Sequence, residues 1–507
     1  MYWEFNIDLA ISEMTTPVTT GLEGLDYILR GGFGANQAHL IEGLPGTGKT
    51  TLALQFLIEG RDRGDAGLFV CTAETRDEIC NIAASHGLSL DGIDIFELFP
   101  TEPAGHHSFD QSIFHTADLE LGETIALLTE RVIAQNPRRV VVSEFSEIRL
   151  LAEEPRPYRQ KIRTLLQFFT GQSCTVLLLE SLMANGDIYL QNLANSVLRL
   201  EQLTLPYGGE RRRMRVSKMR GRAFRGGYHD FVIREGGLRI FPRLVSTDHP
   251  PATVAGAPVT TGIAALDALL GGGIQLGTTT VIRGPSGGGK SALALQPLNA
   301  ALARGEKAMF ITFDETVTNF VRRSHALGLP TKTLLDVGTL RFMRVDPAEL
   351  SPGEFADTVC REILGGVTAI VIDSVSGYQH AVPAENNLLL HLHELLKFLN
   401  EQGVLTVLVV ADGAEEGGLN SPYYLTYLAD TVVEIRFVQS GSGQKRAVFV
   451  TKTRTGGHEP GARELFFDQS GIHVGPTIPG SINQSAMPPV DRWHVDPIIE
   501  TSPVDTE

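Results

Sequence analysis

The sequence lacks the features of an exported or membrane-spanning protein. No stretch of it approaches the roughly 20 apolar residues that a membrane-spanning helix requires, and residues 1–14 have neither the basic nor the apolar segment of a secretory signal. Cysteine is scarce as well: the thiols belong to Cys71, Cys80, Cys174 and Cys360, and none forms a metal-binding spacing such as C-x-x-C. We therefore expect a soluble, cytoplasmic protein whose cysteines are small, buried and reduced.

Positive charge is also in short supply. The chain carries 43 lysines and arginines against 59 aspartates and glutamates, which gives a net charge of −16. A protein that binds the phosphate backbone of nucleic acids is usually basic, so strong nonspecific nucleic-acid binding is disfavoured. Net charge does not describe how charge is distributed, however, and "GERRRMRV" at 209–216 is locally basic.

What the sequence does contain is a long internal repeat. The stretch "EGLPGTGKTTLALQ" at 42–55 returns as "RGPSGGGKSALALQ" at 283–296, so that 241 positions separate Lys49 from Lys290. The same offset relates Gly43 to Gly284, Glu74 to Glu315, Thr20-Gly21 to Thr261-Gly262, and Gly87 to Gly328. A constant offset over residues 20–87 indicates a duplicated domain, because the repeats of solenoid proteins are far shorter.

The repeat predicts two large domains. We expect them at 16–246 and 260–475, joined by a linker at 247–259 that is rich in proline and alanine. An N-terminal segment, 1–15, precedes them. The tail at 476–507 contains many prolines and acidic residues and little that could build a core, so we predict that it is disordered.

Short apolar strands alternate with helices in both copies. The predicted strands are "AHLIE", "GLFVCT", "RRVVVS" and "CTVLLLE" in the first copy, and "TTTVIR", "KAMFITF", "AIVIDS" and "LTVLVV" in the second. This alternation predicts a doubly wound α/β sheet with parallel central strands. Each copy then ends in a predicted β-hairpin, "SVLRLEQL" with "RRRMRVSKMRG" or "TVVEIRFV" with "KRAVFVTKTR", which we expect to extend the sheet in antiparallel fashion.

Both repeated glycine-rich stretches match the phosphate-binding pattern G-x-x-x-x-G-K-[ST]. Backbone N–H groups of such a loop and the N-terminus of the following helix bind phosphate oxygens. We expect Lys49 and Lys290 to reach the β- and γ-phosphates of ATP, and the hydroxyls of Thr50 and Ser291 to bind Mg²⁺. The predicted nucleotide-binding residues are Gly43, Gly46, Thr47, Gly48, Lys49, Thr50 and Thr51, and Gly284, Ser286, Gly287, Gly288, Gly289, Lys290, Ser291 and Ala292.

A phosphate-binding loop also needs a carboxylate that orients Mg²⁺ and its waters. In the second copy, Asp373 follows the apolar residues of the predicted strand "AIVIDS" and is the expected ligand. In the first copy, Ser143 occupies this position, and a serine cannot balance the charge of the ion. Glu144 follows Ser143, and the sequence leaves open whether it replaces the missing carboxylate.

The carboxylate that activates water is expected after the strand that follows the loop helix. The second copy has "TFDET" here, with Asp314 and Glu315 adjacent, whereas the first has "CTAET", with Ala73 and Glu74. A glutamate at the same offset in both copies favours Glu74 and Glu315 as general bases, with Asp314 as a further catalytic candidate.

Basic residues after each predicted hairpin are candidates for contacting the nucleotide of a neighbouring subunit. The first copy has "KMRG", with Lys218 and Arg220, and the second has "KTRTGGH", with Lys452, Arg454 and His458. An arginine supplied in trans stabilises the charge of a transferred phosphoryl group. A solvated, charged strand edge is the alternative interpretation.

Taken together, the doubled loop, "TFDET", "AIVIDS", "KMRG" and "KTRTGGH" resemble the KaiC family of two-domain, RecA-like ATPases from the cyanobacterial circadian clock. "GRAFRGGYHDF" and "YLADTVVEIR" are similar to KaiC-like sequences as well, and the resemblance covers about residues 16–475. It implies tandem RecA-like P-loop NTPase domains, stacked as rings in a homohexamer with ATP at the subunit interfaces. Signalling partner proteins of unknown identity are implied too.

The resemblance also implies autophosphorylation in the second domain. The phospho-acceptors of the family are a Ser-Thr pair upstream of an Asp-Thr, and counting back from Asp430-Thr431 places them at Thr426 and Tyr427. Thr426 keeps a hydroxyl that can accept a phosphoryl group, whereas Tyr427 departs from the threonine of the family. A hydroxyl that only caps or packs locally is the alternative for Thr426.

We therefore expect an ATPase with a signalling or timing role that uses ATP and Mg²⁺. Because of Ala73 and Ser143, we expect the first domain to bind ATP and hydrolyse it slowly, and the second domain to carry most of the turnover. Two other functions stay open, because a fold does not fix a function. One is a RecA-type, DNA-dependent motor, and the other is a nucleotide-gated scaffold with little turnover.

Overall fold

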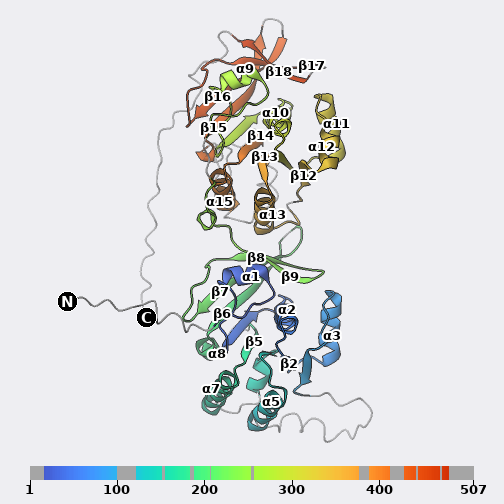
Figure 1. Ribbon diagram of the computed structural model, residues 1–507, viewed down its shortest axis with the longest axis vertical. Helices are drawn as coiled ribbons and strands as arrows, with labels where there is room; N and C mark the ends of the chain where they lie inside the picture. The colour runs from blue at the N-terminus through green and yellow to red at the C-terminus, as the bar shows by residue number, and fades with distance from the viewer. Residues whose placement is uncertain are drawn as a thin grey trace, which may run out of the picture. The chain divides into compact units, whose positions relative to one another are not determined.

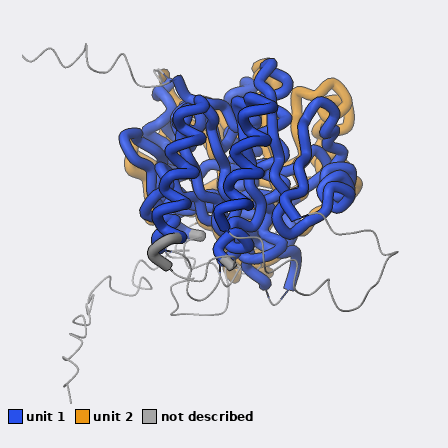
Figure 2. Tube along the Cα trace, turned by 90° about the horizontal axis from the view of Figure 1, so that it is seen from below, with its two compact units in different colours: residues 1–252, 345–367, 377–402 blue, residues 253–344, 368–376, 403–507 orange. Residues whose placement is uncertain are grey.

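The chain forms two compact units in the computed structural model (Figure 2). The first unit comprises residues 1–252, 345–367 and 377–402, and the second comprises residues 253–344, 368–376 and 403–507. The residues whose structure is described are 16–99, 121–150, 155–182, 188–205, 207–252, 256–346, 348–375, 388–411, 427–440, 443–468 and 471–478. The predicted N-terminal segment, and the predicted tail apart from residues 476–478, lie outside these ranges.

Within the described residues, the sheet of the first unit has nine strands in the order β3-β2-β4-β5-β1-β6-β7-β8-β9 (Figure 1). Neighbouring strands are parallel from β3 to β6 and antiparallel from β6 to β9. The strands are β1 (Ala38–Gly43), β2 (Gly67–Cys71), β3 (Asp94–Glu97), β4 (Arg139–Val142), β5 (Thr175–Ser181), β6 (Ser196–Leu203), β7 (Arg211–Met219), β8 (His229–Arg234) and β9 (Gly237–Phe241). The predicted hairpin is β6–β7, and the sequence interpretation missed its continuation into β8 and β9.

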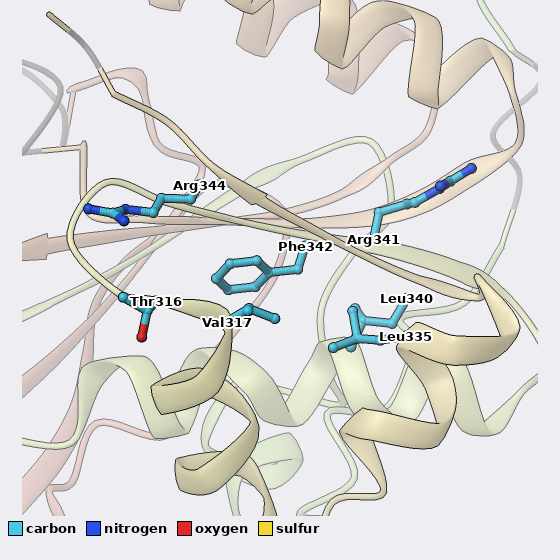
Figure 3. A pocket seen from close by; sticks show the side chains of 7 residues that line it. All are labelled: Thr316, Val317, Leu335, Leu340, Arg341, Phe342 and Arg344. Atoms are coloured by element: carbon cyan, nitrogen blue, oxygen red, sulfur yellow. The ribbon is translucent and has the colours of Figure 1, made fainter.

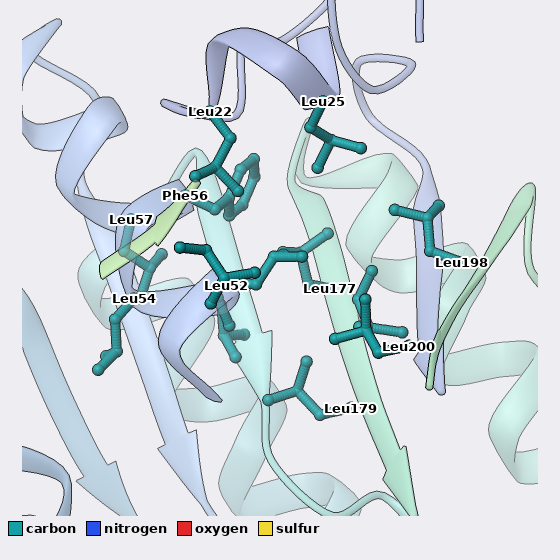
Figure 4. Close-up of a cluster of buried hydrophobic side chains, with 14 of the residues drawn as sticks. Leu22, Leu25, Leu52, Leu54, Phe56, Leu57, Leu177, Leu179, Leu198 and Leu200 are labelled. Atoms are coloured by element: carbon teal, nitrogen blue, oxygen red, sulfur yellow. The ribbon is translucent and has the colours of Figure 1, made fainter. Parts of the chain in front are cut away.

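Helices pack on both faces of this sheet, because alternate residues of its buried strands point to opposite faces. One face packs against α2, and Figure 4 shows part of that cluster, including Leu52, Phe56 and Leu177. The other face packs against α5 and α7 through residues such as Leu40 and Val140. The helical elements in this part of the chain are α1 (Glu23–Ile28), α2 (Lys49–Asp62), α3 (Arg76–Ser85), α5 (Leu121–Gln135), α6 (Ser146–Leu150), α7 (Pro155–Gly171), α8 (Ile188–Leu193) and the 3₁₀ turn η1 (Ser246–Asp248).

The second sheet repeats this topology. Its nine strands in the described residues follow the order β12-β11-β13-β14-β10-β15-β16-β17-β18, with β10 parallel to β14 and β15, and antiparallel pairing from β15 to β18. These strands are β10 (Thr279–Gly284), β11 (Lys307–Thr312), β12 (Leu340–Arg344), β13 (Val367–Asp373), β14 (Leu405–Ala411), β15 (Thr431–Ser440), β16 (Gly443–Thr453), β17 (Arg463–Asp468) and β18 (Gly471–Thr477). The predicted fold, tandem mainly parallel sheets with antiparallel extensions, is confirmed.

The remaining helices come from the second half of the chain. They are α9 (Ala264–Leu269), α10 (Lys290–Ala303), α11 (Val317–Ala326), α12 (Thr331–Val337), α13 (Pro352–Leu364) and α15 (Leu388–Glu401). The first four belong to the second unit, whereas α13 and α15 belong to the first. In the second unit, the cluster of buried residues joins Leu293 and Leu295 of α10 to Phe310 of β11 and Val407 of β14.

The cysteines only partly follow the expectation. Cys71, Cys174 and Cys360 are buried, but Cys80 is exposed on α3, so the prediction of a buried thiol was wrong there. Burial raises the pKa of Cys71 to about 12 and that of Cys174 to about 11, which keeps both thiols protonated. In the part of the chain that the structure describes, no helix combines the length and the apolar character that crossing a membrane requires.

Candidate functional site

The two predicted phosphate-binding loops occupy equivalent places in the two sheets. Each follows β1 or β10 and leads into a helix, α2 or α10, that begins at the loop lysine. The glycine before that lysine has a positive φ, 97° at Gly48 and 101° at Gly289. A Cβ there would lie 2.7 Å from Ile233 Cδ1 or 2.5 Å from Phe467 Cζ. Both the backbone conformation and the available space therefore favour glycine.

The other predicted nucleotide-binding residues lie on the same loops and on the first helical turns. Gly46 and Gly287 also have positive φ values, 81° and 74°, so the two loops curl in the same way. We call the first loop together with Glu74, Ser143 and Glu144 the first site. The second loop together with Glu315 and Asp373 is the second site. The remaining loop and first-turn residues are Gly43, Thr47, Thr50, Thr51, Gly284, Ser286, Gly288, Ser291 and Ala292.

Both loop lysines are buried and fold back onto their own loops. Lys49 Nζ donates to the carbonyl oxygen of Gly43 over 3.0 Å, and Lys290 Nζ donates to that of Gly284 over 2.8 Å. Only 6% of Lys49 and 8% of Lys290 is exposed to solvent. A buried amino group is stabilised by such acceptors, so each loop holds its lysine where phosphate oxygens are expected.

In the first site, the serine that stands in place of the metal-binding aspartate holds the predicted general base. Ser143 directly follows β4, and its Oγ donates to Glu74 Oε2 over 2.8 Å. The same oxygen accepts from the backbone N–H of Thr72 over 3.2 Å. Because Ser143 is buried, its hydroxyl fixes the Glu74 carboxylate through a hydrogen bond from a neutral donor.

Glu144 brings a second carboxylate into the first site. Its Oε1 lies 3.4 Å from Lys49 Nζ and accepts from Ser181 Oγ, at the end of β5, over 2.9 Å. Lys49 Nζ in turn donates to Ser181 Oγ over 3.1 Å. The backbone of Glu144 has a φ of 33°, a left-handed conformation that is uncommon for a side chain of this size. The glutamate that sequence analysis left open is therefore an ion-pair partner of the loop lysine.

In the second site, the two predicted metal ligands are adjacent. A side-chain hydrogen bond joins Asp373, the last residue of β13, to Ser291, which follows the loop lysine. Burial raises the pKa of Asp373, whereas the bond from Ser291 and the positive charges of Arg323 and Lys290 oppose this rise. Thr50 offers the corresponding hydroxyl in the first site, but the residue equivalent to Asp373 is Ser143.

These ligands fit the way in which Mg²⁺ is usually bound beside a nucleotide. Mg²⁺ keeps several waters and takes one or two protein carboxylates together with phosphate oxygens, rather than an all-protein cage. Within the described ranges, no group of three or more His, Cys, Asp or Glu side chains could hold a metal ion. The hydroxyl of Ser291 and the carboxylate of Asp373 suit an ion that takes its other ligands from a nucleotide and water.

The predicted general base of the second site is held by a residue that sequence analysis missed. Arg323, on α11, donates from Nε to Glu315 Oε1 over 3.1 Å and from Nη2 to Glu315 Oε2 over 2.6 Å. Asp314, the other acidic candidate, is exposed. The repeat offset contained a signal, because Ile82 of the first copy stands where the second copy has Arg323.

Two of the predicted trans-acting cations are lysines that bind within the chain. Lys218 Nζ donates to the carbonyl oxygens of Gln191 and Ala194 over 2.6 and 2.7 Å. Lys452 Nζ donates to the carbonyl oxygen of Ala429 over 2.7 Å. Partial burial lowers the pKa of both lysines. Each lysine thus binds the backbone of the segment that precedes the first strand of its hairpin, β6 or β15.

The partner arginines lie at the surface. Arg220 and Arg454 directly follow the last residues of β7 and β16, and both are exposed. Arg220 Nη2 donates to the carbonyl oxygen of Asn192 over 2.7 Å, and Arg454 Nη2 to that of Tyr427 over 3.0 Å. His458 follows further along and is half-buried. Arg220 and Arg454 are therefore more exposed to solvent than Lys218 and Lys452, respectively.

A β-bulge lies beside each of these lysines. In the first unit, Val197 pairs with Lys218, and the register shifts between Val197 and Leu198. In the second unit, Val432 pairs with Lys452, and the register shifts immediately after Val432. One extra residue on β7 and on β16 therefore separates the fastened lysine from the regular part of the hairpin.

The predicted phospho-acceptor, Thr426, lies outside the described residues. The neighbouring Tyr427 is 73% exposed. Besides Arg454, its carbonyl oxygen accepts from Lys452 Nζ over 3.4 Å.

The locally basic stretch at 209–216 lies mostly on β7, and ion pairs within the protein neutralise part of its charge. Arg212 Nη2 pairs with Glu210 Oε2 and Arg213 Nη2 with Glu201 Oε2, each over 2.9 Å. The guanidinium of Arg213 also lies 3.9 Å from the ring centre of Tyr228. These contacts reduce the charge that the stretch presents to a nucleic-acid backbone.

A pocket of about 590 Å³ lies near the second site in sequence but does not include its loop (Figure 3). It is bounded by the start of α11, by α12 and by the edge strand β12, with Phe342 between Arg341 and Arg344 in the view of Figure 3. Its lining residues are Thr316, Val317, Leu335, Leu340, Arg341, Phe342 and Arg344. None of them is a predicted nucleotide-binding residue, so this pocket is distinct from the second site.

Comparisons with known proteins agree with the doubled architecture. A family model described as "ATPase: KaiC" matches residues 18–245 and again residues 259–478. The chain is similar to the circadian clock oscillator protein KaiC of Picosynechococcus sp., with 24% identity over 469 residues, which are 90% of this chain and 89% of the relative. It is also similar to the KaiC proteins of Synechococcus elongatus, 24% identical over 486 residues (91% and 92% of the two chains), and Acaryochloris marina, 24% identical over 468 residues (90% and 88%).

Proposed function

Because the chain belongs to the KaiC family of ATPases, we propose that it hydrolyses ATP at two unequal sites, of which the second carries most of the turnover. The observation that supports this proposal is the hydrogen-bonded pair of Ser291 and Asp373 beside the second loop. In the first site, the residue equivalent to Asp373 is Ser143, which is bonded to Glu74 instead.

Each residue of the second site has a defined task in this proposal. The backbone N–H groups of the loop and of the first turn of α10 bind phosphate oxygens, and Lys290 balances the charge of the β- and γ-phosphates. Glu315 accepts the proton of the water that attacks the γ-phosphorus. Ser291 and Asp373 would hold Mg²⁺, which neutralises charge on the phosphates when bound.

The first site is proposed to bind ATP mainly for assembly and to hydrolyse it slowly. Its loop and Lys49 have the same geometry as their counterparts, so the phosphates have equivalent donors. It offers a general base, Glu74, but the buried residue after β4 is a serine that brings no negative charge. A metal ion is therefore balanced less well there, unless Glu144 leaves Lys49 and takes over that role.

The decisive experiment compares Glu315→Gln with Glu74→Gln in steady-state ATPase assays. Glutamine keeps the size of the side chain but cannot accept the proton, so Glu315→Gln is expected to lower turnover by about 100-fold. Glu74→Gln should leave most of the turnover in place. If Glu74→Gln removes the activity and Glu315→Gln spares it, the assignment of the two sites is reversed.

We further propose a homohexameric ring with ATP at the subunit interfaces. The resemblance to KaiC supports this assembly, and the exposure of Arg220 and Arg454 supports them as candidates for contacting a neighbour's phosphates. The particle mass, measured by light scattering with and without ATP, tests the ring. Arg454→Ala is expected to lower turnover without changing the mass, whereas an unchanged rate would remove this arginine from the mechanism.

A signalling or timing role with autophosphorylation is the third part of the proposal. It rests on the similarity to proteins named for the circadian clock and on the hydroxyl of Thr426. Incubation with γ-labelled ATP, followed by phosphosite mapping, should place label on Thr426 and none on Thr426→Ala. Label that persists in Thr426→Ala would assign the acceptor to another residue.

A nucleotide-gated scaffold with little turnover is the second candidate function. The observation that favours it is that Arg323 engages both carboxylate oxygens of Glu315. Tight retention of ATP with turnover near zero would support the scaffold. A DNA-dependent motor has no comparable support, and we expect no DNA mobility shift with or without ATP.

A further inference from the structure

The pair formed by Arg323 and Glu315 has the geometry of a firm contact. Two nitrogens of one guanidinium each meet a different oxygen of one carboxylate, at 3.1 and 2.6 Å, and the two side chains are only 27% and 21% exposed. Bidentate, charge-assisted hydrogen bonds are the strong kind, and partial burial limits their screening by salt. Arg323 is also held by two rings, because its guanidinium lies 5.9 Å from the centre of Phe310 and 5.8 Å from that of Phe320.

The guanidinium of Arg323 also interacts electrostatically with Asp373 of the second site. The positive charge of Arg323 favours the ionised form of Asp373, the negative charge of Glu315 disfavours it, and Ser291 is bonded to it. Arg323 therefore acts on the two carboxylates that the proposed mechanism needs, one for the metal ion and one for the water. Its Nη1 is buried and has no hydrogen-bond partner within the described residues, so Arg323 is not fully satisfied by Glu315.

The first site has no equivalent of this contact. The repeat offset places Ile82 opposite Arg323, and α3 and α11 begin at equivalent residues, each after a threonine N-cap. Glu74 accepts from the neutral hydroxyl of Ser143 instead. A neutral donor orients one oxygen of a carboxylate, whereas the bidentate guanidinium of Arg323 occupies both oxygens of Glu315.

We propose that Arg323 is a positioning residue that restrains Glu315, so that hydrolysis at the second site requires this ion pair to open. The inference rests on the proposed role of Glu315 as general base and deepens it. In the hydrolytic step, water attacks the γ-phosphorus of ATP, the bond to the β,γ-bridging oxygen breaks, ADP leaves and the water proton passes to Glu315. A carboxylate engaged at both oxygens is poorly disposed to take that proton, and the second site therefore turns over slowly until Arg323 moves away.

The test uses the full chain with Glu74→Gln as background, so that the measured rate reports the second site. In this background, Arg323→Ile installs the residue of the first copy and is expected to raise kcat roughly two- to tenfold, the range that a partly buried ion pair can account for. KM and the Kd of a fluorescent ATP analogue should change less than about twofold, because the pair is proposed to act on the base and not on ATP binding.

Matched variants separate restraint from a general effect on the fold. Arg322→Ile removes the same side chain one position earlier, where it is exposed, and should leave kcat unchanged. Arg323→Lys keeps the charge but loses the fork, so kcat should lie between those of the parent and of Arg323→Ile. Arg323→Gln serves in place of Arg323→Ile if the latter does not fold. Combining Arg323→Ile with Glu315→Gln should abolish the increase.

The outcomes distinguish this inference from the proposed function. If Glu315→Gln lowers turnover but Arg323→Ile and Arg323→Gln leave kcat unchanged or lower it, the restraint is refuted, and a lower kcat would mean that Arg323 orients the base for catalysis. If Glu315→Gln itself has no effect, the proposed role of the second site fails before the pair is tested.

Discussion

The two units have the same strand order and the same phosphate-binding pattern in their loops. The equivalent carboxylates of their sites, Glu74 and Glu315, however, have different hydrogen-bond partners. In the first site, a neutral serine holds the proposed general base, Glu74, and Glu144 faces the loop lysine. In the second site, Asp373 lies beside the loop hydroxyl and Arg323 engages the proposed general base, Glu315. The comparison teaches that duplication preserved the phosphate-binding parts, while the parts that would activate water and balance a metal ion diverged.

The largest expected effect on ATPase turnover comes from exchanging the residue types of Ser143, which follows β4, and Asp373, which ends β13. Asp373→Ser should lower turnover of the second site by about 100-fold, because the metal ion loses its carboxylate. Conversely, Ser143→Asp should raise first-site turnover by about tenfold when measured in the Glu315→Gln background. Steady-state ATPase rates check both. If Ser143→Asp brings no increase, Glu144 already supplies the missing charge and the two sites are less different than proposed.

The second expected difference is sensitivity to acid. His39 on β1 is buried, with Nδ1 2.8 Å from Ser196 Oγ and Nε2 2.9 Å from the carbonyl oxygen of Gly34. The second copy has Thr280 at this offset. Burial lowers the pKa of His39 to about 4 from an ordinary value of 6.5, so the folded state binds a proton less readily than the unfolded chain. The contribution of neutral His39 to stability is therefore present above pH 6.5 and is lost as the pH falls toward 4.

Urea unfolding at pH 7.5 and pH 5 measures this effect. The parent should lose about 2 kcal/mol more than His39→Thr between these two conditions, as the linkage of a single shifted histidine predicts. The comparison uses the change with pH and not the absolute stability, because the substitution itself alters packing. Equal losses in the two proteins would show that His39 does not set the acid sensitivity.

The smallest expected effect concerns Glu144. Its carboxylate neutralises Lys49 and repels phosphate, so Glu144→Gln should tighten ATP binding at the first site about two- to fivefold. The measurement is titration with a fluorescent ATP analogue in a Lys290→Ala background, with Glu147→Gln as the control carboxylate on the adjacent helix. Weaker, Mg²⁺-dependent binding in Glu144→Gln would instead assign Glu144 to the metal ion.

Much of the fold follows from local sequence patterns. The loops of Lys49 and Lys290 and the buried strands are encoded by contiguous residues, so the sequence predicted four parallel strands and the hairpin of each sheet, but not the edge strands β3 and β12. The strands β8 and β9 were missed because they contain charged residues and lack the apolar runs of the central strands.

The candidate site was harder to predict where its contacts join separate elements. Arg323 lies on α11 and Glu315 precedes that helix, so the regular spacing of a single helix or strand does not predict their contact. The bond between Ser143 and Glu74 likewise joins the ends of two neighbouring strands that are distant in the chain. The sequence shows Ser143 in place of the expected aspartate, but its partner, Glu74, is visible only in three dimensions.

The paired bulges beside Lys218 and Lys452 bear on the side of each hairpin on which the residues beyond them lie. Successive residues of a regular strand point to opposite sides, and the bulge takes up the extra residue so that Lys218 still pairs with Val197 and Val216 with Leu198. Arg220 and Arg454 stand just past that insertion in their respective units. Removing Ser217 or Thr451, with every other residue kept, would restore regular alternation at the bulge and leave the arginine on its present side of the hairpin.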